Sequence, residues 1–507
     1  MSRSRWSGPL ALLASLLLLL LVFSPAAAQD TEAPDGVAPA TSGHAAATGL
    51  GARDELADEG KLEGSILWRF QSLLGMVTIV GGSYLLSKSR AHVDWRLVGW
   101  GLGLQLFLGF LVMKTPGMKE PLLRPVFAAV NDAFNALMGC TTDGASFLFG
   151  NLSKGNNVPV GPGGLHGPVG DTGQMASVGA YFAFAVLPTI IFFSSFMALL
   201  YHLGVMQAVV KAIAVVMQKT MGTSGSETLS ASGNIFVGQT EAPLLVRPFV
   251  PTMTESELMA VMTGGFATVA GGVMAAYVGF LKDTFPNIAG HLLSASVMSA
   301  PAALVCAKLL VPEPDKTKSE TYGALKVDLQ KVDANVIDAA ARGAGDGLKL
   351  ALNVGAMLLA FVAMIALMNK SLGYLCYLVN AAPITLQQVL GWLCWPVAWL
   401  MGIPAEDCGL VGRLVGVKTV ANEFLAYIEL SGMIGDAPGT LQHGRSVVIS
   451  TYALCGFANF SSIAIQIGGI SGIAPERRSD LAKLGLKAMI AGNLACFMTA
   501  CVAGLLI

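Results

Sequence analysis

Residues 225–249 form a stretch that is too polar and too broken to be a simple membrane helix. They read Gly225-Ser-Glu-Thr-Leu-Ser-Ala-Ser-Gly-Asn-Ile-Phe-Val-Gly-Gln-Thr-Glu-Ala-Pro-Leu-Leu-Val-Arg-Pro-Phe249. The apolar pieces at 235–237 and 244–246 are far shorter than the roughly 20 residues that a spanning helix needs. An ionisable side chain at mid-membrane costs at least about 2.5–3.5 kcal/mol, so it is tolerated where it faces a cavity. The stretch therefore predicts a re-entrant hairpin with a polar tip, or else a surface loop with helix caps.

A second stretch is interrupted in the same way. It reads Gly412-Arg-Leu-Val-Gly-Val-Lys-Thr-Val-Ala-Asn-Glu-Phe-Leu-Ala-Tyr427. After a connector, each stretch is followed by one tripeptide and a polar residue, Gly265-Phe-Ala-Thr268 in the first case and Gly456-Phe-Ala-Asn459 in the second. Loop charges place the first hairpin on the cytoplasmic side and the second on the outer side. Matching broken helices in two inverted halves indicate a transporter's binding site.

The composition indicates that lipid is the main solvent of this chain. Of its 507 residues, 54% are hydrophobic and 12% are charged, and the net charge is −1; the mean hydropathy is +0.63. A soluble domain carries roughly a quarter charged residues, and nucleic-acid binding needs a basic face that this charge does not provide. The eight cysteines form no C-x-x-C pair, and six of them lie in or beside apolar runs, where a free thiol behaves as a small hydrophobic side chain: Cys376, Cys394, Cys408, Cys455, Cys496 and Cys501. The six histidines have no metal-ligand spacing.

Apolar runs then predict an all-α polytopic membrane protein with about eight transmembrane helices and the two hairpins. The runs are 66–86, 97–112, 178–201, 258–281, 291–311, 348–368, 447–472 and 484–507. Lys88, Arg90 and Arg96 follow the first run, so we expect that loop in the cytoplasm. Residues 126–138 predict an interfacial helix, and the Gly/Pro-rich tract at 155–173 predicts a flexible outer loop.

The amino terminus resembles a secretory leader. Arg3 and Arg5 precede an apolar stretch, and small residues end it near residue 28. Residues 1–28 are therefore a signal peptide or an uncleaved first helix, and 29–64 a flexible periplasmic segment. We divide the rest into scaffold helices at 65–202, a first transport repeat at 203–312, a cytoplasmic loop with a scaffold helix and an outer interfacial segment at 313–404, and a second transport repeat at 405–507.

The polar side chains at the two tips suggest what they bind. Gln239 and Asn459 carry amides, Thr240, Ser461 and Ser462 carry hydroxyls, and Glu241 and Glu423 are strong acceptors when ionised. Such groups without an arginine clamp suit a neutral polyhydroxylated solute better than an anion. Arg247 and Arg413 flank the tips, and we interpret them as structural or interfacial.

At these motifs the sequence resembles the concentrative nucleoside transporters. The resemblance rests on Gly238-Gln-Thr-Glu241, Asn422-Glu-Phe424 and Cys455-Gly-Phe-Ala-Asn-Phe-Ser-Ser462, with Ala334-Asn-Val-Ile-Asp-Ala-Ala-Ala341 leading into Leu352-Asn-Val-Gly-Ala-Met357, and covers roughly residues 66–507. It implies that five side chains contact the nucleobase: Gln239, Thr240, Glu241, Val273 and Phe457. It also implies that Glu423, Asn459 and Ser462 hold the ribose hydroxyls.

The resemblance further implies a coupling cation and an assembly. A sodium ion would take the Asn234 side chain, the Thr268 hydroxyl and the backbone carbonyls of Val237 and Val269, an all-oxygen set that suits a hard cation. Protons remain the alternative coupling ion, and no other cofactor is expected. The family implies a homotrimer in the bacterial inner membrane, surrounded by lipid, that carries nucleosides such as uridine, cytidine or adenosine by an elevator motion.

Three other functions compete with this interpretation. A cation-coupled symporter of another small polar solute, such as a carboxylate, would use the same architecture. A membrane-embedded hydrolase could use Glu241 and Glu423 as a general acid–base pair, but the sequence offers it no metal set and no activated nucleophile. A receptor that does not transport would leave the repeated broken segments without a purpose.

Overall fold

The computed structural model describes residues 56, 65–113, 124–154, 158–159, 175–176, 182–282, 284–322, 333–378, 380–435 and 439–507. The predicted leader at 1–28 lies outside these residues. So does the segment at 29–64 apart from residue 56, and so does most of the Gly/Pro-rich tract at 155–173.

The described chain is almost wholly helical, which confirms the all-α class. Its only strands within the described ranges are β1 (Val158–Pro159) and β2 (Met175–Ala176), which pair antiparallel. The α-helices are α3 (Ile66–Leu85), α4 (Trp95–Val112), α5 (Arg124–Phe149), α6 (Phe182–Ala185), α7 (Leu187–His202), α8 (Val205–Met221), α9 (Gly225–Gly233), α10 (Glu255–Ala267), α11 (Gly271–Leu281), α12 (Ile288–Leu310), α13 (Val336–Leu378), α14 (Leu386–Leu400), α15 (Cys408–Val420), α16 (Glu423–Gly432), α17 (Gly444–Leu454), α18 (Phe460–Ser471) and α19 (Arg478–Leu506). The 3-10 helices are η2 (Arg90–His92), η3 (Gly150–Lys154), η4 (Ala242–Thr252), η5 (Lys316–Lys318) and η6 (Pro475–Arg477).

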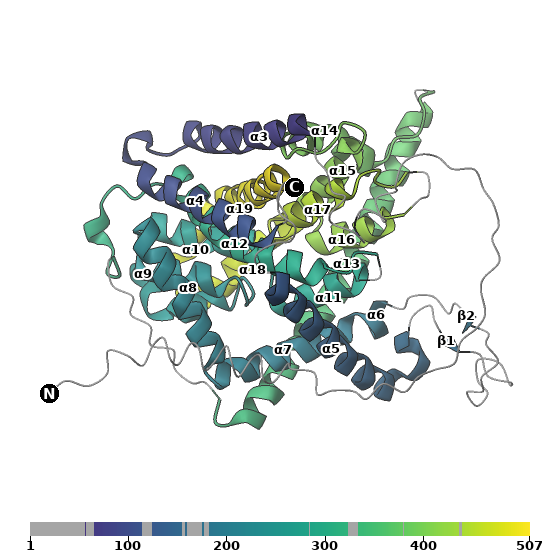
Figure 1. Cartoon of the computed structure of the whole chain (residues 1–507), viewed down its shortest axis with the longest axis horizontal. Helices are drawn as coiled ribbons and strands as arrows, with labels where there is room; N and C mark the ends of the chain where they lie inside the picture. Colours follow the sequence, from purple (N-terminus) through teal and green to yellow (C-terminus); the bar gives the residue numbers. More distant parts are fainter. Residues whose placement is uncertain are drawn as a thin grey trace.

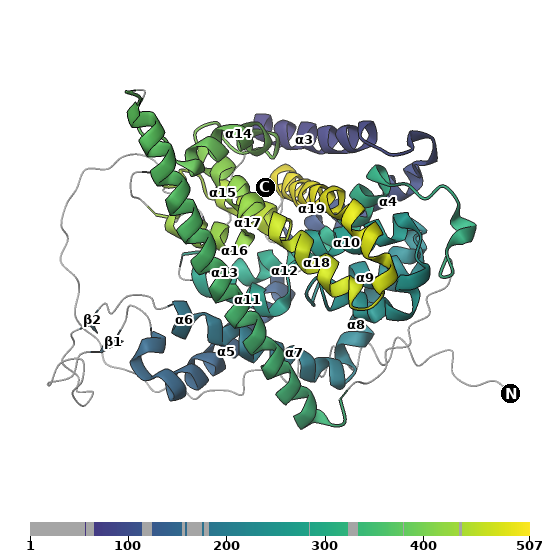
Figure 2. The same cartoon turned by 180° about the vertical axis from the view of Figure 1, so that it is seen from behind.

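A buried group of helices forms the centre of the molecule. Helices α10, α12, α17 and α19 pack against one another, with α3 along one side and α5 and α7 along the opposite side (Figure 1). Helix α13 runs along the outside from the top to the bottom of the view and packs on α7 (Figure 2). The apolar windows of α12 and α13 are 89% and 17% buried, respectively, which separates inner helices from outer ones.

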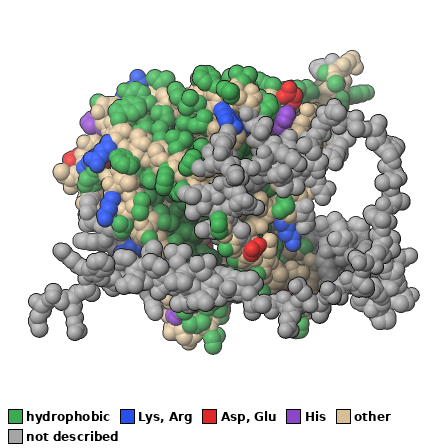
Figure 3. Space-filling view, in the orientation of Figure 1, with side chains coloured by type: hydrophobic (Ala, Val, Ile, Leu, Met, Phe, Trp, Pro, Cys, Tyr) green, Lys and Arg blue, Asp and Glu red, His purple; other side chains and the backbone are tan. Residues whose placement is uncertain are grey.

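Six helical segments among the described residues are long and apolar enough to cross a membrane. They are Trp95–Val112, Ala183–His202, Glu255–Leu281, Ile288–Leu310, Val336–Leu378 and Pro475–Leu506. The face over α3 and α4 is covered largely by apolar side chains with scattered charges (Figure 3). Phe70 of α3 and Phe107 of α4 are both exposed. Such a surface suits lipid. The predicted count of eight spans stays a prediction.

Two apolar runs that we expected to be continuous are broken. The run at 258–281 divides into α10 and α11, and the run at 447–472 divides into α17 and α18. Hydropathy misses both breaks because Val269, Ala270 and Ala458 are as apolar as a helix interior. Their backbone groups find partners elsewhere in the fold, as irregular backbone at membrane depth requires: Phe457 N–H donates to Thr268 O at 3.3 Å.

Other boundaries also shift in the structure. The predicted interfacial helix at 126–138 is the longer α5, and the run at 348–368 is the middle of α13, which has 43 residues. The described part of the run at 178–201 forms two helices, the short α6 and then α7, where Pro188 occupies the first turn. Proline fits there because the first N–H groups of a helix have no intrahelical partner.

Candidate functional site

The first hairpin consists of α9 and η4, which pack against each other on either side of the turn at 234–241. Ser224 and Glu227 start α9 as a capping box, in which each side chain accepts a hydrogen bond from the other residue's backbone N–H. Helix α9 ends at Gly233, and the next helix, η4, begins at Ala242, so the residues between them form a turn. This break places Gln239 and Thr240 at the tip.

The second hairpin is formed by α15 and α16, which also pack together. Ala421 has a non-helical backbone (φ −95°, ψ −89°), and Asn422 is the N-cap of α16, accepting a hydrogen bond from Leu425 N–H. Asn422 is therefore a helix cap, as one alternative proposed. It is nevertheless buried, as is Glu423 beside it, so this tip is not a surface loop.

The carboxylate of Glu423 is held between two donors. Tyr277 Oη donates to one carboxylate oxygen at 3.0 Å, and Asn459 Nδ2 donates to the other at 3.0 Å. These partners come from α11 and from the break before α18, so three elements meet at this group. Sequence reasoning missed Tyr277, which is fully buried and stacked on Tyr427 with ring centroids 4.2 Å apart. No motif marked it.

A chain of amides and hydroxyls joins the first hairpin to α18. Asn459 is the N-cap of α18, and its Oδ1 accepts from Ser462 N–H at 2.9 Å. Gln239 Nε2 donates to Ser462 Oγ at 3.2 Å, and Gln466 Nε2 donates to Gln239 Oε1 at 3.1 Å. The tip of one hairpin is thereby tied to the residues that hold Glu423. Gln466 was also missed, because one glutamine in an apolar run carries no motif.

The repeated Gly-Phe-Ala tripeptides lie at these contacts, where a side chain on their glycines would clash. A Cβ on Gly265 would lie 2.8 Å from Gln466 Nε2 and 2.9 Å from Gln239 Cβ. A Cβ on Gly456 would lie 2.7 Å from the backbone carbonyl oxygen of Phe266. Only glycine allows the two breaks and the first tip to approach so closely.

The remaining predicted residues surround this network. Thr240 packs on Gly469 of α18, Val273 is buried near the start of α11, and Phe457 is partly buried in the second break. Glu241 is exposed, and its carboxylate accepts from Gly238 N–H at 3.0 Å. The described hydrogen bonds join Gln239, and not Glu241, to the residues around Glu423.

Two of the four residues predicted to bind sodium, Asn234 and Thr268, lie against Gly264 near the end of α10. Asn234 is fully buried; its Nδ2 donates to Ser230 O at 3.1 Å, and its Oδ1 has no hydrogen-bond partner among the described residues. Thr268 is buried too, and its hydroxyl donates to Gly264 O at 2.9 Å, which leaves its oxygen lone pairs free to accept. A buried acceptor without a partner is costly, and a small cation would satisfy it.

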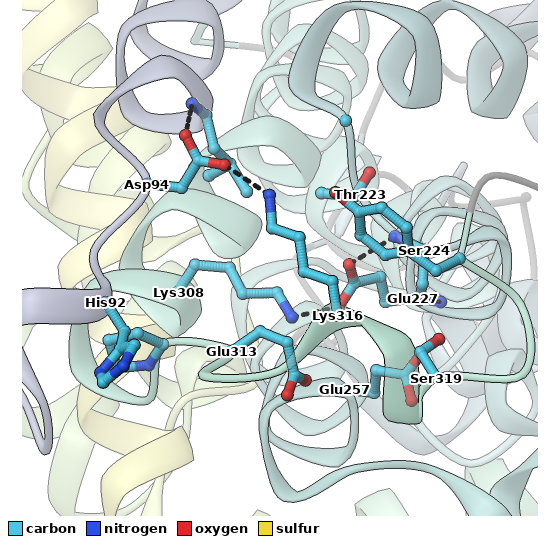
Figure 4. Close-up of a pocket in the computed structure, with 14 residues that line it drawn as sticks. His92, Asp94, Thr223, Ser224, Glu227, Glu257, Lys308, Glu313, Lys316 and Ser319 are labelled. Carbon is cyan, nitrogen blue, oxygen red and sulfur yellow. Dashed lines mark hydrogen bonds and ion pairs between the residues drawn. The ribbon is translucent and has the colours of Figure 1, made fainter.

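A separate polar cluster anchors the base of the first hairpin (Figure 4). Lys308 of α12 forms an ion pair of 2.5 Å with Glu227 of α9, and both side chains are almost fully buried. Nearby, Lys316 pairs with Asp94 at 2.8 Å. Partial burial raises the pKa of the Asp94 carboxyl. The opposing effect of Lys316 and of the first N–H groups of α4 is larger in sum, so this pKa lies below its usual value.

Arginine has no part in the described network of the tips. Arg413 forms an ion pair with Glu429 at 2.9 Å, and Arg247 is exposed. The site therefore offers amides, hydroxyls and carboxylates, which suit a neutral ligand with several hydroxyl groups.

Three family models match the chain. "Na+ dependent nucleoside transporter N-terminus" matches residues 74–152, "Nucleoside recognition" matches 183–284, and "Na+ dependent nucleoside transporter C-terminus" matches 291–504. Together they span both hairpins and both breaks.

Individual proteins agree with these models. A Bacillus subtilis protein described as uncharacterized transporter YutK is 41% identical over 87% of this chain and 100% of its own length. The rat sodium/nucleoside cotransporter 1 is 42% identical over 83% of this chain. The chain spans about three fifths of the length of the mammalian relatives that it matches (57–61%).

Solved structures show the same architecture. CNTnw in an inward-facing substrate-bound state is 41% identical, covers 86% of this chain and 97% of its own, and matches with a TM-score of 0.74. A variant of CNTnw in an outward-facing state is 42% identical, covers 87% of this chain and 98% of its own, and matches with a TM-score of 0.76. The chain therefore belongs to the Na+-dependent, concentrative nucleoside transporter family.

Proposed function

We propose that this protein imports nucleosides by symport with a cation and alternates access to its site by an elevator motion. The observation that carries the proposal is the buried network in which Asn459 donates to Glu423 while Gln239 of the first hairpin donates to Ser462. A nucleoside offers ribose hydroxyls at one end and a hydrogen-bonding base edge at the other. The network offers complementary groups over the same two regions. Because the family consists of transporters, the hydrolase alternative is rejected.

The proposed roles divide the site in two. Gln239, Thr240 and Glu241 contact the nucleobase, with Val273 and Phe457 providing apolar surface beside it. Glu423, Asn459 and Ser462 bind the ribose hydroxyls. Uridine, cytidine and adenosine are the expected solutes, since every one of them carries the same ribose.

We further propose that the cation is sodium, bound by Asn234, Thr268 and the carbonyls of Val237 and Val269. The unpartnered Asn234 Oδ1 supports sodium over protons, because an amide oxygen binds a hard cation and does not titrate. Since the turn at 234–241 carries both Asn234 and Gln239, bound sodium would order the tip and raise nucleoside affinity. By linkage, nucleoside would raise sodium affinity by the same factor.

The proposed architecture has eight spanning helices and two re-entrant hairpins in inverted repeats. The scaffold regions at 65–202 and 313–404 support transport repeats at 203–312 and 405–507, and three copies assemble in the bacterial inner membrane. The outer position of α13 against α7 supports a scaffold role for both helices.

Uptake into proteoliposomes tests this proposal. Purified protein is reconstituted, and labelled uridine and adenosine are supplied under an inward sodium gradient or an inward proton gradient. We expect accumulation of chemically unchanged nucleoside under the sodium gradient, blocked by unlabelled uridine and not by a dicarboxylate. Accumulation driven by protons alone would reject the sodium assignment. Absence of nucleoside uptake under both gradients, with dicarboxylate uptake instead, would reject the function.

A further inference from the structure

Lys418 is a buried ammonium group without a nearby counter-ion. It lies in α15, in the first arm of the second hairpin, and its side chain is 0% exposed. Its Nζ donates to Ala453 O at 2.8 Å and lies 5.8 Å from the centroid of the Phe497 ring. The described residues provide no ion pair for it, and Glu423 attracts it only from a longer distance. A buried charge is retained against a large desolvation cost, so its surroundings must compensate for that cost.

The compensation comes from the carboxyl end of α17. The last four carbonyls of a helix lack intrahelical partners and carry partial negative charge. In α17 two of them accept from backbone N–H groups inside the break, and side chains of the second hairpin satisfy the other two. Tyr427 Oη donates to Thr451 O at 2.7 Å, and Lys418 donates to Ala453 O. Lys418 is thus a cationic cap on the helix that leads into the second break.

The first break also follows the carboxyl end of a helix, but that end has a different cap. Helix α10 ends at Ala267, where the recorded donors to its last carbonyls are neutral, namely the Thr268 hydroxyl and the Cys496 thiol. The neighbouring hairpin contributes Asn234, whose side chain lies against Gly264 of α10 and whose oxygen has no hydrogen-bond partner among the described residues. At the first break the proposed sodium ion would supply a cation from solution. At the second break the chain carries its own.

We propose that the Lys418 ammonium is a built-in cation that serves the second broken span in the way that transported sodium serves the first. It neutralises the carboxyl end of α17 and so holds the segment bearing Phe457 and Asn459 in the geometry that binds Glu423 and the ribose. Lys418 is a positioning residue and does not contact the solute. One consequence is that the second break itself binds no cation from solution. This inference rests on the proposed nucleoside site.

The test compares three substitutions at this position. Lys418→Met removes the charge at similar volume, Lys418→Gln keeps a hydrogen-bond donor without charge, and Lys418→Arg keeps the charge. Uridine Kd is measured on purified protein at saturating sodium. We expect Met and Gln to raise Kd by about tenfold or more, as loss of a charged hydrogen-bond donor predicts, and Arg to stay within about threefold of the wild type. The control Lys88→Met, which removes an exposed lysine that pairs with Glu255 at the start of α10, should leave Kd unchanged.

A second measurement is independent of nucleoside. Thermal stability is followed against sodium concentration at constant ionic strength with choline as the replacement. We expect single-site stabilisation of the wild type, with the same sodium midpoint in Lys418→Gln, because the first break is untouched. Cooperative two-site stabilisation of the wild type would overturn the proposal, and so would an unchanged uridine Kd in Lys418→Gln. If Lys418→Met does not fold, the Gln and Arg variants make the same comparison. A wild-type protein that binds sodium but no uridine would instead reject the proposed function.

Discussion

Replacing Glu423 with glutamine tests the ribose assignment with little change in shape. The amide has the size of the carboxylate, and its two ends can meet both existing partners. Its oxygen can accept from Asn459 Nδ2. The Asn459 amide keeps this orientation because its Oδ1 accepts from Ser462 N–H as the N-cap of α18. The NH₂ group of the introduced glutamine then faces Tyr277, whose hydroxyl can rotate to accept. We therefore expect Glu423→Gln to fold and to keep its sodium-dependent stabilisation.

The loss in uridine affinity follows from the charge. A hydrogen bond to a charged group contributes about 1.5–3 kcal/mol and a neutral one about 0.5–1.5 kcal/mol. If two ribose hydroxyls donate to the carboxylate, the substitution removes about 2–3 kcal/mol from binding. At 1.4 kcal/mol for each factor of ten, the uridine Kd should rise by about 30- to 150-fold.

Binding of labelled uridine to purified protein at saturating sodium measures this change, and proteoliposome uptake should fall in parallel. The matched control is Glu429→Gln, the same substitution further along α16, where the carboxylate pairs with Arg413. The control should leave the uridine Kd within about twofold, since a partly exposed ion pair contributes little. A uridine Kd in Glu423→Gln that stays within threefold of the wild type would refute the reasoning.

Three further changes test other parts of the site and of the fold. Gly265→Ala should destabilise the protein by about 1–3 kcal/mol through overpacking and weaken uridine binding, whereas Gly468→Ala, which meets open space, should do neither; equal effects in a melting and binding assay would contradict the close-contact argument. Thr268→Ala should raise the sodium midpoint of thermal stabilisation by about tenfold, equivalent to about 1.4 kcal/mol for a lost ligand, and an unchanged midpoint would favour protons. Because Lys316 and the N–H groups of α4 hold the pKa of Asp94 below its usual value, the pair stabilises the fold above about pH 4 and the contribution disappears as pH falls through the lowered pKa. Asp94→Asn should therefore lower the free energy of unfolding at pH 7 by less than about 1 kcal/mol for so exposed a pair. The stabilities of the two proteins should converge once the pH lies below the lowered pKa of Asp94.

The sequence predicted much of the site because unusual residues in apolar surroundings stand out. Gln239, Glu423 and Asn459 interrupt hydrophobic runs where a polar group is costly, and the structure brings them into one network. Tyr277 and Gln466 escaped prediction. Tyrosine in an apolar helix and a single glutamine are common, and only the position of a partner from another helix gives them a role.

Local features of the chain predict the helical class, the two broken polar segments and the polar residues at their tips, because length, hydropathy and buried charge act locally along the chain. The tertiary structure decided where the two long runs break, since residues as apolar as Val269 and Ala458 leave the helix only when distant groups accept or donate their backbone hydrogen bonds. It also decided that the first tip joins the second half through Gln239, and that Lys418 caps α17. These depend on contacts between residues far apart in sequence, which no local pattern records.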